Sequence, residues 1–410
     1  MPEEHHPNPL PDLLVTNQVV GPLMVQLLDS LEESGTRCAA LTGWVEAGAG
    51  EQTRFEVIPA VRLRKRPAWK RLLSWGAFTL QAAWQLIRRR RRPALIVSNP
   101  PTTALLAPLI RRLTGRRYAL LVYDIYPELM ERMGLVREGG PIARFWRGMH
   151  RRAMRRADGV VTIGSRMADT LRAQLREGDE VDIAVLPNWA DTDFVRPIPK
   201  SDNAFAREHG LVGKLVVSYS GAFGATHDVD SIIASAEMLT DLDEVHFLLI
   251  GGGTREAEVR ELVAEKGLPN LTLLPLQPWE TVPLSFAAAD VAIVCLDEAY
   301  RGLSVPSKTY YTLSAGAATL AISPPDTELT DLVVDEQCGW HVVPRDPAGI
   351  AKVVRAACAD RESLGRKQAN ARRAAEQHYS RDVMVGRWID WLGGTLGQSV
   401  GPATCCGRND

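Results

Sequence analysis

Short apolar runs alternate along this chain with glycine- or proline-rich loops and helical segments, and this alternation restricts the fold more than any other feature. Residues 94–99 and 118–123 have the length and composition of buried strands. Each is closed by a turn and followed by a segment with helical periodicity. Repeated strand–loop–helix units form parallel sheets that are covered by helices. The sequence therefore predicts the α/β class.

The alternation occurs twice, on either side of a proline-containing stretch at residues 191–203. Strands are predicted after it at 215–219, 245–250, 271–274 and 291–296. A chain of 410 residues is also too long for one ordinary core. We therefore expect two Rossmann-like domains facing a cleft. The expected parts are a first domain at 13–198, a second at 199–378, a C-terminal helix at 379–395 returning toward the first domain, and a mobile tail at 396–410.

Composition places the chain among folded proteins of a reducing compartment. Hydrophobic residues make up 45% and charged residues 24%. The six cysteines form no C-x-x-C pair, so neither a disulfide framework nor a zinc site is indicated. Residues 1–11 lack a signal-peptide pattern, and no apolar run reaches the roughly 18 residues that a spanning helix needs. We expect a cytoplasmic protein without a bound metal or cofactor.

The charges are strongly segregated, although the net charge is only −1. Residues 57–123 contain no Asp or Glu but fifteen Lys or Arg, so the rest of the chain is acidic. Such segregation indicates a polyanionic partner, either a membrane surface or a nucleic acid. The stretch has few aromatic residues at loop positions and no known nucleic-acid-binding motif. We therefore expect an anionic membrane surface and no nucleic acid.

A helix predicted at residues 70–88 lies inside this basic stretch. Polar residues fall on one of its faces and apolar residues cover the wide remainder. A wide apolar sector with two tryptophans and flanking arginines is typical of a helix in a membrane interface. The alternative is a packed helix with a basic exposed edge. The predicted membrane-facing residues are Lys70, Arg71, Trp75, Trp84, Arg88, Arg89 and Arg90.

Residues 305–316 carry the clearest candidate for a binding site. They follow the predicted strand 291–296 and an acidic loop, and Ser304 is placed to cap a helix that ends at Gly316. Open α/β sheets bind ligands at the carboxyl ends of their strands. Free N–H groups at the helix start, with Lys308 one turn in, favour an anion, which we interpret as a diphosphate. The alternative is an ordinary strand–helix unit with a solvated lysine.

Other candidate residues lie at the ends of predicted strands. Loops at Gly221–Gly224 and Gly251–Gly253 would let backbone N–H groups approach a phosphate. Gly21 occupies a similar loop in the first half, although the G-x-G-x-x-G fingerprint is absent. Asp124 stands where the strand 118–123 ends, which makes it a site candidate or, alternatively, a helix cap.

Taken together, these motifs resemble the glycosyltransferase family 4 enzymes of GT-B fold. The resemblance is closest to bacterial enzymes that build capsule, O-antigen or exopolysaccharide repeats on a lipid carrier. It covers roughly residues 13–392. The motifs that carry it are residues 124–128, 218–224, 249–253, 267–271, 288–291, 305–308, 315–316, 338–340 and 346–347.

The resemblance implies a retaining transfer that needs no metal. The C-terminal domain would bind a nucleoside-diphosphate sugar, and the N-terminal domain a polyprenyl-phosphate-linked or other lipid-linked acceptor at the inner face of the plasma membrane. Lys308 would stabilise the leaving diphosphate, and Asp124 would position or deprotonate the acceptor hydroxyl. The implied donor-binding residues are Gly21, Gly221, Gly224, His227, Gly252, Gly253, Leu276, Gln277, Ser307, Lys308 and Tyr311.

The chain departs from the family pattern at its acidic positions. The family usually has two glutamates eight residues apart, and these positions are Leu303 and Tyr311 here. Phe223 stands where an arginine is common, while Asp297 and Glu298 are nearby carboxylates. Two alternatives therefore stay open. One is a nucleotide-sugar 2-epimerase, which shares the fold but needs no basic amphipathic helix, and the other is a glycosyltransferase-like subunit that binds or scaffolds without catalysis.

Overall fold

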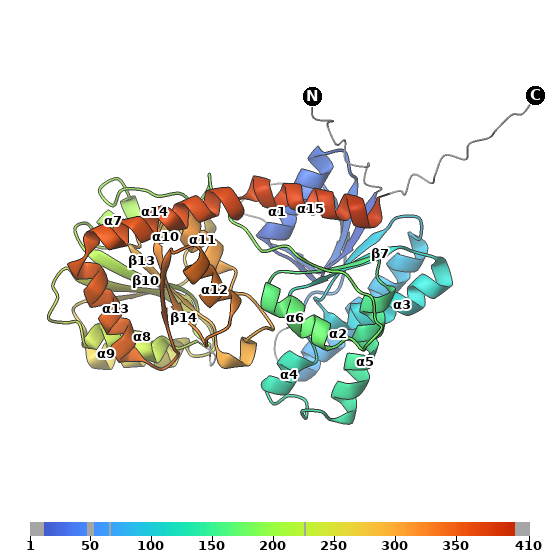
Figure 1. Cartoon of the computed structure of the whole chain (residues 1–410), viewed down its shortest axis with the longest axis horizontal. Coiled ribbons are helices and arrows are strands. Elements are labelled where there is room, and N and C mark those ends of the chain that lie inside the picture. The colour runs from blue at the N-terminus through green and yellow to red at the C-terminus, as the bar shows by residue number, and fades with distance from the viewer. Residues whose placement is uncertain (1–11, 47–52, 65–66, 225–226, 398–410) are drawn as a thin grey trace, which may run out of the picture.

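The computed structural model describes residues 12–46, 53–64, 67–224 and 227–397. Two parallel β-sheets lie side by side along the long axis of the molecule, each with helices on both faces (Figure 1). The predicted α/β fold with two Rossmann-like halves is confirmed. Most strands are apolar throughout because helices cover both faces of each sheet. The predicted tail at 396–410, with Cys405 and Cys406, lies almost wholly outside the described residues.

The N-terminal sheet has seven parallel strands, and their spatial order reverses between β1 and β6. Ligands bind at such reversals in open α/β sheets, outside the carboxyl ends of the strands. In spatial order the strands are β5 (Glu56–Pro59), β3 (Cys38–Thr42), β1 (Leu13–Thr16), β6 (Ala94–Val97), β7 (Tyr118–Val122), β8 (Gly159–Thr162) and β9 (Ile183–Val185). A separate short pair joins β2 (Val19–Val20) to β4 (Trp44–Val45).

Helices α2, α3 and α5 pack side by side on one face of this sheet, and α1 lies on the other (Figure 1). Because all three follow strands of a parallel sheet, they begin near its carboxyl edge. Their C-terminal ends, which are rich in arginine, gather at the opposite edge. The helices of this half are α1 (Pro22–Glu33), α2 (Ala68–Arg88), α3 (Pro101–Thr114), α4 (Glu128–Arg132), α5 (Pro141–Arg156) and α6 (Ser165–Ala173).

The C-terminal sheet has six parallel strands, with the reversal between β10 and β13. In spatial order they are β12 (Leu271–Leu274), β11 (Val245–Gly252), β10 (Leu215–Ala222), β13 (Val291–Cys295), β14 (Ala318–Ile322) and β15 (Gly339–Val342). The helices are α7 (Ala204–Glu208), α8 (Val229–Glu237), α9 (Glu256–Lys266), α10 (Val282–Ala287), α11 (Lys308–Ser314), α12 (Glu328–Asp335), α13 (Pro347–Ala359) and α14 (Arg361–His378), with 3₁₀ turns η1 (Trp279–Thr281) and η2 (Glu298–Tyr300).

The last helix, α15 (Arg381–Leu396), returns to the N-terminal half. It follows α14 across both halves and packs against α1 (Figure 1). Trp388, Leu392 and Leu396 on this helix are buried in the hydrophobic core of the first sheet. The N-terminal core is therefore closed by the final helix of the chain.

The two halves also meet where the carboxyl ends of their strands face each other. The backbone N–H of Ile125 donates a hydrogen bond to the carbonyl of Leu303 (3.2 Å). Leu303 belongs to the C-terminal half, yet its side chain is fully buried in the N-terminal core. The Arg132 guanidinium donates to the carbonyls of Glu298 (2.9 Å) and Arg301 (3.1 Å). The loop around η2 thus joins the two halves.

Candidate active site

Lys308 and Gly221 meet at the reversal of the C-terminal sheet. Gly221 lies near the end of β10, and Lys308 begins α11. The Lys308 ammonium lies 3.8 Å from the centroid of the Tyr219 ring. A Cβ added at Gly221, whose φ is +156°, would come within 3.0 Å of the Lys308 Nζ. Glycine at 221 therefore leaves the ammonium open from the side of β10.

The Lys308 ammonium is buried and has no hydrogen-bond partner among the residues of the described ranges. Burial lowers its pKa to about 8. A buried charge without a partner is costly, and proteins keep one mainly where a ligand completes it. The arrangement therefore suits an anion that meets the ammonium from the Gly221 side, away from the Tyr219 ring.

The helix that carries Lys308 differs from the predicted one. It begins at Lys308 itself and spans about two turns, so Ser304 is not its cap and Lys308 is not one turn in. Lys308 instead reaches the site from the first helical residue. Tyr219 was not predicted as a site residue, because nothing local in the sequence indicates that its ring lies beneath this lysine.

His227 is a second unpartnered group beside Lys308. Its Nδ1 is buried without a hydrogen-bond partner in the part of the chain that the structure describes. A Cβ at Gly224 would lie 3.1 Å from this nitrogen. The pKa of His227 is lowered by burial first and by the Lys308 charge next, while Asp297 raises it. Lys308 and Asp297 therefore influence His227 with opposite signs.

Phe223 is fully buried and carries no charge into the site. Its backbone carbonyl would lie 2.8 Å from a Cβ at Gly253, whose φ is +142°. A Cβ at Gly252 would lie 3.0 Å from the Glu256 carboxylate and 3.6 Å from Leu276. Close backbone packing therefore requires glycine at 253, whereas the neighbours of Gly252 are side chains. The predicted contact of these glycines with a phosphate stays a prediction.

Leu276 and Gln277, two of the implied donor-binding residues, follow the edge strand β12, and Leu276 lies beside Gly252. The Leu276 side chain is 62% exposed. The Gln277 amide donates to the Pro275 carbonyl (2.8 Å), which fixes its orientation. Ser307 is exposed just before α11. An exposed aliphatic side chain next to a backbone edge can cover the face of a base.

Tyr311 lies in an aromatic cluster with Trp279, Phe286 and Phe194. Its ring centroid is 6.3 Å from that of Trp279 and 5.8 Å from that of Phe286. Trp279 stacks on Phe194 of the interdomain linker, with centroids 5.2 Å apart. Burial raises the pKa of Tyr311 to about 12. Trp279 and Phe194 were not predicted here, since only the fold brings the linker to this helix.

The two carboxylates in the loop between β13 and α11 have different surroundings. Leu303, at a usual glutamate position, points into the N-terminal core. Glu298 pairs with Arg301 (2.7 Å) at the exposed surface. Asp297 is the nearby carboxylate whose charge reaches His227. The Asp297 side chain accepts a hydrogen bond from the Ala299 N–H (2.9 Å) and so caps η2.

Gly21 precedes α1 in the N-terminal half, whereas Lys308 and Gly221 belong to the C-terminal half. A Cβ at Gly21 would lie 3.8 Å from a Glu46 carboxylate oxygen. This negative charge makes the start of α1 a poorer place for a phosphate than the loop pattern suggests.

Asp124 lies at the carboxyl edge of the N-terminal sheet, just after β7, and it is not a helix cap because α4 begins at Glu128. Burial raises the pKa of its carboxyl group, and a hydrogen bond from the Ser304 side chain lowers it. This contact crosses between the halves, from the loop around η2 to the predicted acceptor side. The sequence predicts Ser304 only as a helix cap. Its contact with Asp124 joins residues that are 180 positions apart, which no local pattern indicates.

The exposed face of α2 is apolar, whereas part of the polar face predicted from the sequence is buried. The prediction is wrong for Trp75, which is only 7% exposed and packs edge-on against Tyr126 with centroids 6.2 Å apart. Ser74 and Gln85, from the polar face, are buried too. Apolar residues occur on nearly every side of α2, so the position of its polar residues does not show which face is exposed. The exposed apolar residues are Trp69, Leu72, Leu73, Leu80, Trp84 and Ile87.

Basic side chains border this apolar face. The Lys70 ammonium lies 5.3 Å from the Trp69 ring centroid, and the Arg88 guanidinium carbon 5.2 Å from that of Trp84. Arg90 is exposed. Arg89 departs from the prediction, because it forms a two-point ion pair with Glu56 (2.6 and 2.8 Å).

The neighbouring helices extend the same surface. Exposed apolar side chains continue from α2 onto α3 and α5 at Leu109, Leu113, Ile142 and Phe145. A cavity of about 400 Å³ between α3 and α5 is lined by Pro108, Arg111, Arg112, Gly115, Arg152 and Arg156. No helix in the described ranges is both long and apolar enough to span a bilayer.

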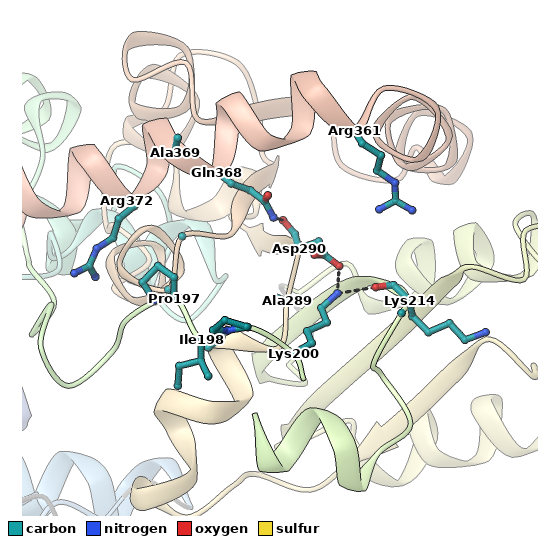
Figure 2. Close-up of a pocket in the computed structure, with 15 residues that line it drawn as sticks. Pro197, Ile198, Lys200, Lys214, Ala289, Asp290, Arg361, Gln368, Ala369 and Arg372 are labelled. Atoms are coloured by element: carbon teal, nitrogen blue, oxygen red, sulfur yellow. Dashed lines mark hydrogen bonds and ion pairs between the residues drawn. The ribbon is translucent and has the colours of Figure 1, made fainter. Parts of the chain in front are cut away.

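A further cavity of about 740 Å³ lies at the opposite edge of the C-terminal sheet, between the linker and α14 (Figure 2). Lys214 and Asp290 in its wall precede β10 and β13, so it opens at the amino edge, away from Lys308. Dashed lines in Figure 2 join Lys200 to Asp290 and to the Lys214 carbonyl. Lys200 and Asp290, the charged groups at the centre of this cavity, thus form an ion pair with each other.

Comparisons with known proteins agree with this geometry. The family model described as a glycosyl transferase 4-like domain matches residues 20–189, and that for glycosyl transferases group 1 matches residues 201–377. The probable glycosyltransferase WbjE of Pseudomonas aeruginosa is 27% identical over 80% of this chain and 82% of its own length. The putative colanic acid biosynthesis glycosyl transferase WcaI of Escherichia coli is 26% identical over 64% and 66%.

Solved structures share the fold at low identity. HepE of Anabaena, in complex with UDP, superimposes with a TM-score of 0.70 and 15% identity, covering 93% of this chain and 100% of its own. WaaG, a glycosyltransferase involved in lipopolysaccharide biosynthesis, gives a TM-score of 0.67 with 16% identity over 93% and 100%.

Proposed function

This chain belongs to the glycosyltransferases, since family models of that class match both of its halves, and on this premise we propose a retaining transfer from a nucleoside-diphosphate sugar to a lipid-linked acceptor. The product would be an intermediate of a bacterial surface polysaccharide. The names of WbjE, WcaI and WaaG support this setting, and the UDP complex of HepE supports the donor class.

The unpartnered Lys308 ammonium carries the proposal. The leaving group of such a transfer is a nucleoside diphosphate, whose negative charge grows as the glycosidic bond breaks. A buried ammonium held over the Tyr219 ring and open toward Gly221 supplies a fixed positive charge at that place. Because the site is enclosed, water screens the attraction less than at an exposed surface. No metal is required for this role.

Asp124 would act on the acceptor. Its carboxyl group is buried on the N-terminal side and has a raised pKa. A carboxylate of this kind can position a sugar hydroxyl or take its proton as the new bond forms. Ser304 would hold Asp124 only while the two halves touch, so closure around the donor would also set the acceptor carboxylate.

Incubation with radiolabelled nucleotide sugars and a membrane lipid extract tests the proposal. We expect radioactivity to enter the lipid phase with one donor, or slow release of free sugar when lipid is omitted. Conversion of the sugar nucleotide to its C2 epimer would establish an epimerase instead. Nucleotide binding without transfer, hydrolysis or epimerisation would establish a binding subunit.

A binding subunit is the second candidate, and the loop around η2 favours it. Leu303 is buried in the N-terminal core, and Tyr311 packs among aromatic rings. Neither usual glutamate position therefore presents a carboxylate to the donor. Asp297 is the group on which catalysis would depend in their absence.

Tyr311→Phe should weaken nucleotide binding modestly. The phenol would offer the ribose one neutral hydrogen bond, where a glutamate offers two oxygens. Loss of that bond should cost about 0.5–1.5 kcal/mol in UDP affinity by titration calorimetry. The aromatic cluster should survive, because the ring remains. Identical affinities would mean that Tyr311 only packs against Trp279 and Phe286.

The exposed surface of α2, α3 and α5 would dock on the inner face of the plasma membrane. A lipid-linked acceptor is confined to the bilayer surface, so the enzyme must reach it there. Exposed Leu80 and Trp84 would enter the interface, and the bordering arginines would meet anionic headgroups at about 1 kcal/mol each. The protein would then be cytoplasmic and peripheral.

Replacing Leu80 and Trp84 with serine should release the protein from anionic vesicles. The wild type should co-sediment with vesicles containing phosphatidylglycerol, less so at high salt, and little with neutral ones. Gln at Arg88, Arg90 and Arg91 should also release it, because these side chains are exposed. UDP affinity should not change, because the donor site lies in the other half.

Val334→Ser is the matched control, since Val334 is 63% exposed on the C-terminal half and should not affect sedimentation. Equal binding of the wild type to anionic and neutral vesicles, with no effect of either set of changes, would exclude this surface. Nucleic acid would then be the next polyanion to test.

A further inference from the structure

Arg71, in the first turn of α2, has a donor with nothing to bind. Its Nε–H is buried and lacks a hydrogen-bond partner among the residues that the structure describes. Its guanidinium carbon lies 5.4 Å from the centroid of the Trp75 ring. An unpaired buried donor is costly, and an oxygen of a ligand would supply the missing acceptor.

A second unpaired donor lies at the far end of the same group of rings. Tyr126 meets Trp75 edge-on and stacks on Trp146, with centroids 6.2 Å apart in each case. We call Trp75, Tyr126 and Trp146 the aromatic stack. The Trp146 indole N–H is buried and has no acceptor within the described ranges. Two donors without acceptors thus flank one rigid stack.

The charges around the stack place it next to the acceptor carboxylate. The pKa of the Tyr126 phenol is raised by burial and further by Asp124, and it is lowered by Arg71. Arg71 and Asp124 therefore both lie close to this phenol. Glu128 is the other carboxylate nearby. Its Oε1 accepts from the Arg147 guanidinium (2.7 Å), and its Oε2 is buried without a hydrogen-bond partner among the described residues. No ion pair joins Arg71 to a carboxylate within the described ranges.

The other side of this helix end is apolar and exposed. Trp69, Leu72 and Leu73, in the same first turns of α2, are each more than half exposed. A molecule that reached Asp124 from this direction would pass a hydrocarbon-compatible surface first and Arg71 next. That order matches a prenyl chain, then its phosphate, then its sugar.

We propose that Arg71 binds the phosphate or diphosphate of the lipid-linked acceptor, beside the Trp75 end of the aromatic stack and between the apolar face of α2 and Asp124. This rests on the proposed function and assigns its acceptor side. A guanidinium suits this task because it is always charged and can donate two parallel hydrogen bonds to phosphate oxygens. The chain would thus hold the two diphosphates of its reaction with different cations, Lys308 for the donor and Arg71 for the acceptor.

Titration calorimetry with farnesyl diphosphate, in the presence of saturating UDP, tests the proposal on the full chain. UDP fills the donor site, so Lys308 cannot account for the heat of a second diphosphate. We expect farnesyl diphosphate to bind the wild type, and Arg71→Gln to weaken it by about ten-fold to a hundred-fold. Arg71→Lys should recover part of the loss, because the charge remains. Arg176→Gln, an exposed arginine outside this region, is the matched control.

Trp146→Phe keeps an aromatic ring at the far end of the stack and removes the indole N–H, so farnesyl diphosphate affinity should stay at the wild-type value, in contrast to Arg71→Gln. Inorganic pyrophosphate and farnesol represent the diphosphate and the prenyl part of farnesyl diphosphate. Each should bind far more weakly than farnesyl diphosphate itself. Pyrophosphate binding as tight as that of farnesyl diphosphate would identify a free-phosphate site and overturn the lipid assignment.

Farnesyl diphosphate affinity that is equal in wild type and Arg71→Gln, or absent in the wild type, would also overturn the proposal. Neither result would bear on the proposed donor site at Lys308, because UDP titration of the wild type and of Lys308→Ala tests that site independently. Loss of UDP binding in the wild type, with prenyl diphosphate binding intact, would instead remove the proposed transfer and leave a lipid-phosphate site.

Discussion

Lys308→Ala is expected to slow transfer by about 10²–10³-fold, because one fixed donor at a developing negative charge contributes about 2–4 kcal/mol to the transition state. UDP affinity should fall as well, since the diphosphate keeps part of that charge after the bond breaks. The fold should tolerate the change, because the Lys308 ammonium makes no hydrogen bond within the described residues. Steady-state kinetics and UDP titration measure the two effects.

The same lysine gives a pH dependence whose sign follows from its pKa. Burial lowers the pKa of Lys308 from 10.5 to about 8 in the folded chain. Free protein loses the ammonium charge as the pH rises through about 8, so UDP affinity should fall above that pH. Between the folded and unfolded pKa values the unfolded chain binds more protons, so the free energy of unfolding should rise with pH there. Lys308→Ala should abolish both slopes.

Lys367→Ala provides a matched control in the same half. Lys367 also lies over an aromatic ring, 5.0 Å from the Trp340 centroid, but away from the strand ends that face the N-terminal half. It should keep wild-type turnover and UDP affinity. If Lys308→Ala behaves in the same way as Lys367→Ala, the diphosphate does not lie at this lysine.

Leu303→Glu should destabilise the protein by about 3 kcal/mol or more, although it restores the residue that the family usually has. The Leu303 side chain is fully buried in the N-terminal core, where a carboxylate would be desolvated and unpaired. Thermal unfolding should shift downward, and transfer should fall because the loop can no longer hold the two halves together. Leu303→Met keeps the volume and should cost less than about 1.5 kcal/mol.

A different outcome would be equally informative. An active and stable Leu303→Glu protein would mean that the loop around η2 leaves the N-terminal core when donor binds. Position 303 would then face the sugar, and the buried leucine would belong to the unliganded arrangement alone. The shift in thermal unfolding that UDP causes should then be larger in Leu303→Glu than in the wild type, because a carboxylate that reaches the donor site would tighten nucleotide binding to the folded state.

Prediction from the sequence succeeded where local pattern decides the structure. The strand at 291–296 and the turn at Gly221 are short-range features, and a parallel sheet must bring their carboxyl ends together. That rule alone places Lys308 near Gly221. The boundary of α11 was less predictable, because Ser304 satisfies the local preference for a cap while its side chain is used by Asp124.

Contacts between distant segments could not be predicted in this way. Trp75 and Trp84 are nine positions apart on a helix that is apolar on nearly every side, so periodicity cannot tell which tryptophan faces the sheet. The burial of Leu303 depends on the other half of the molecule. Arg71 looked like one of many surface cations, and only the fold shows that its Nε–H is enclosed without a partner.

The position of α15 has a consequence for how the protein is made. The ribosome releases the N-terminal half first, but the helix that covers its core with Trp388 and Leu392 emerges only after the whole C-terminal half. Domains generally fold as units during synthesis. The first half of this chain must therefore wait, with part of its apolar surface uncovered, until about two hundred further residues have been translated. A chaperone that shields this surface during translation should raise the yield of folded protein.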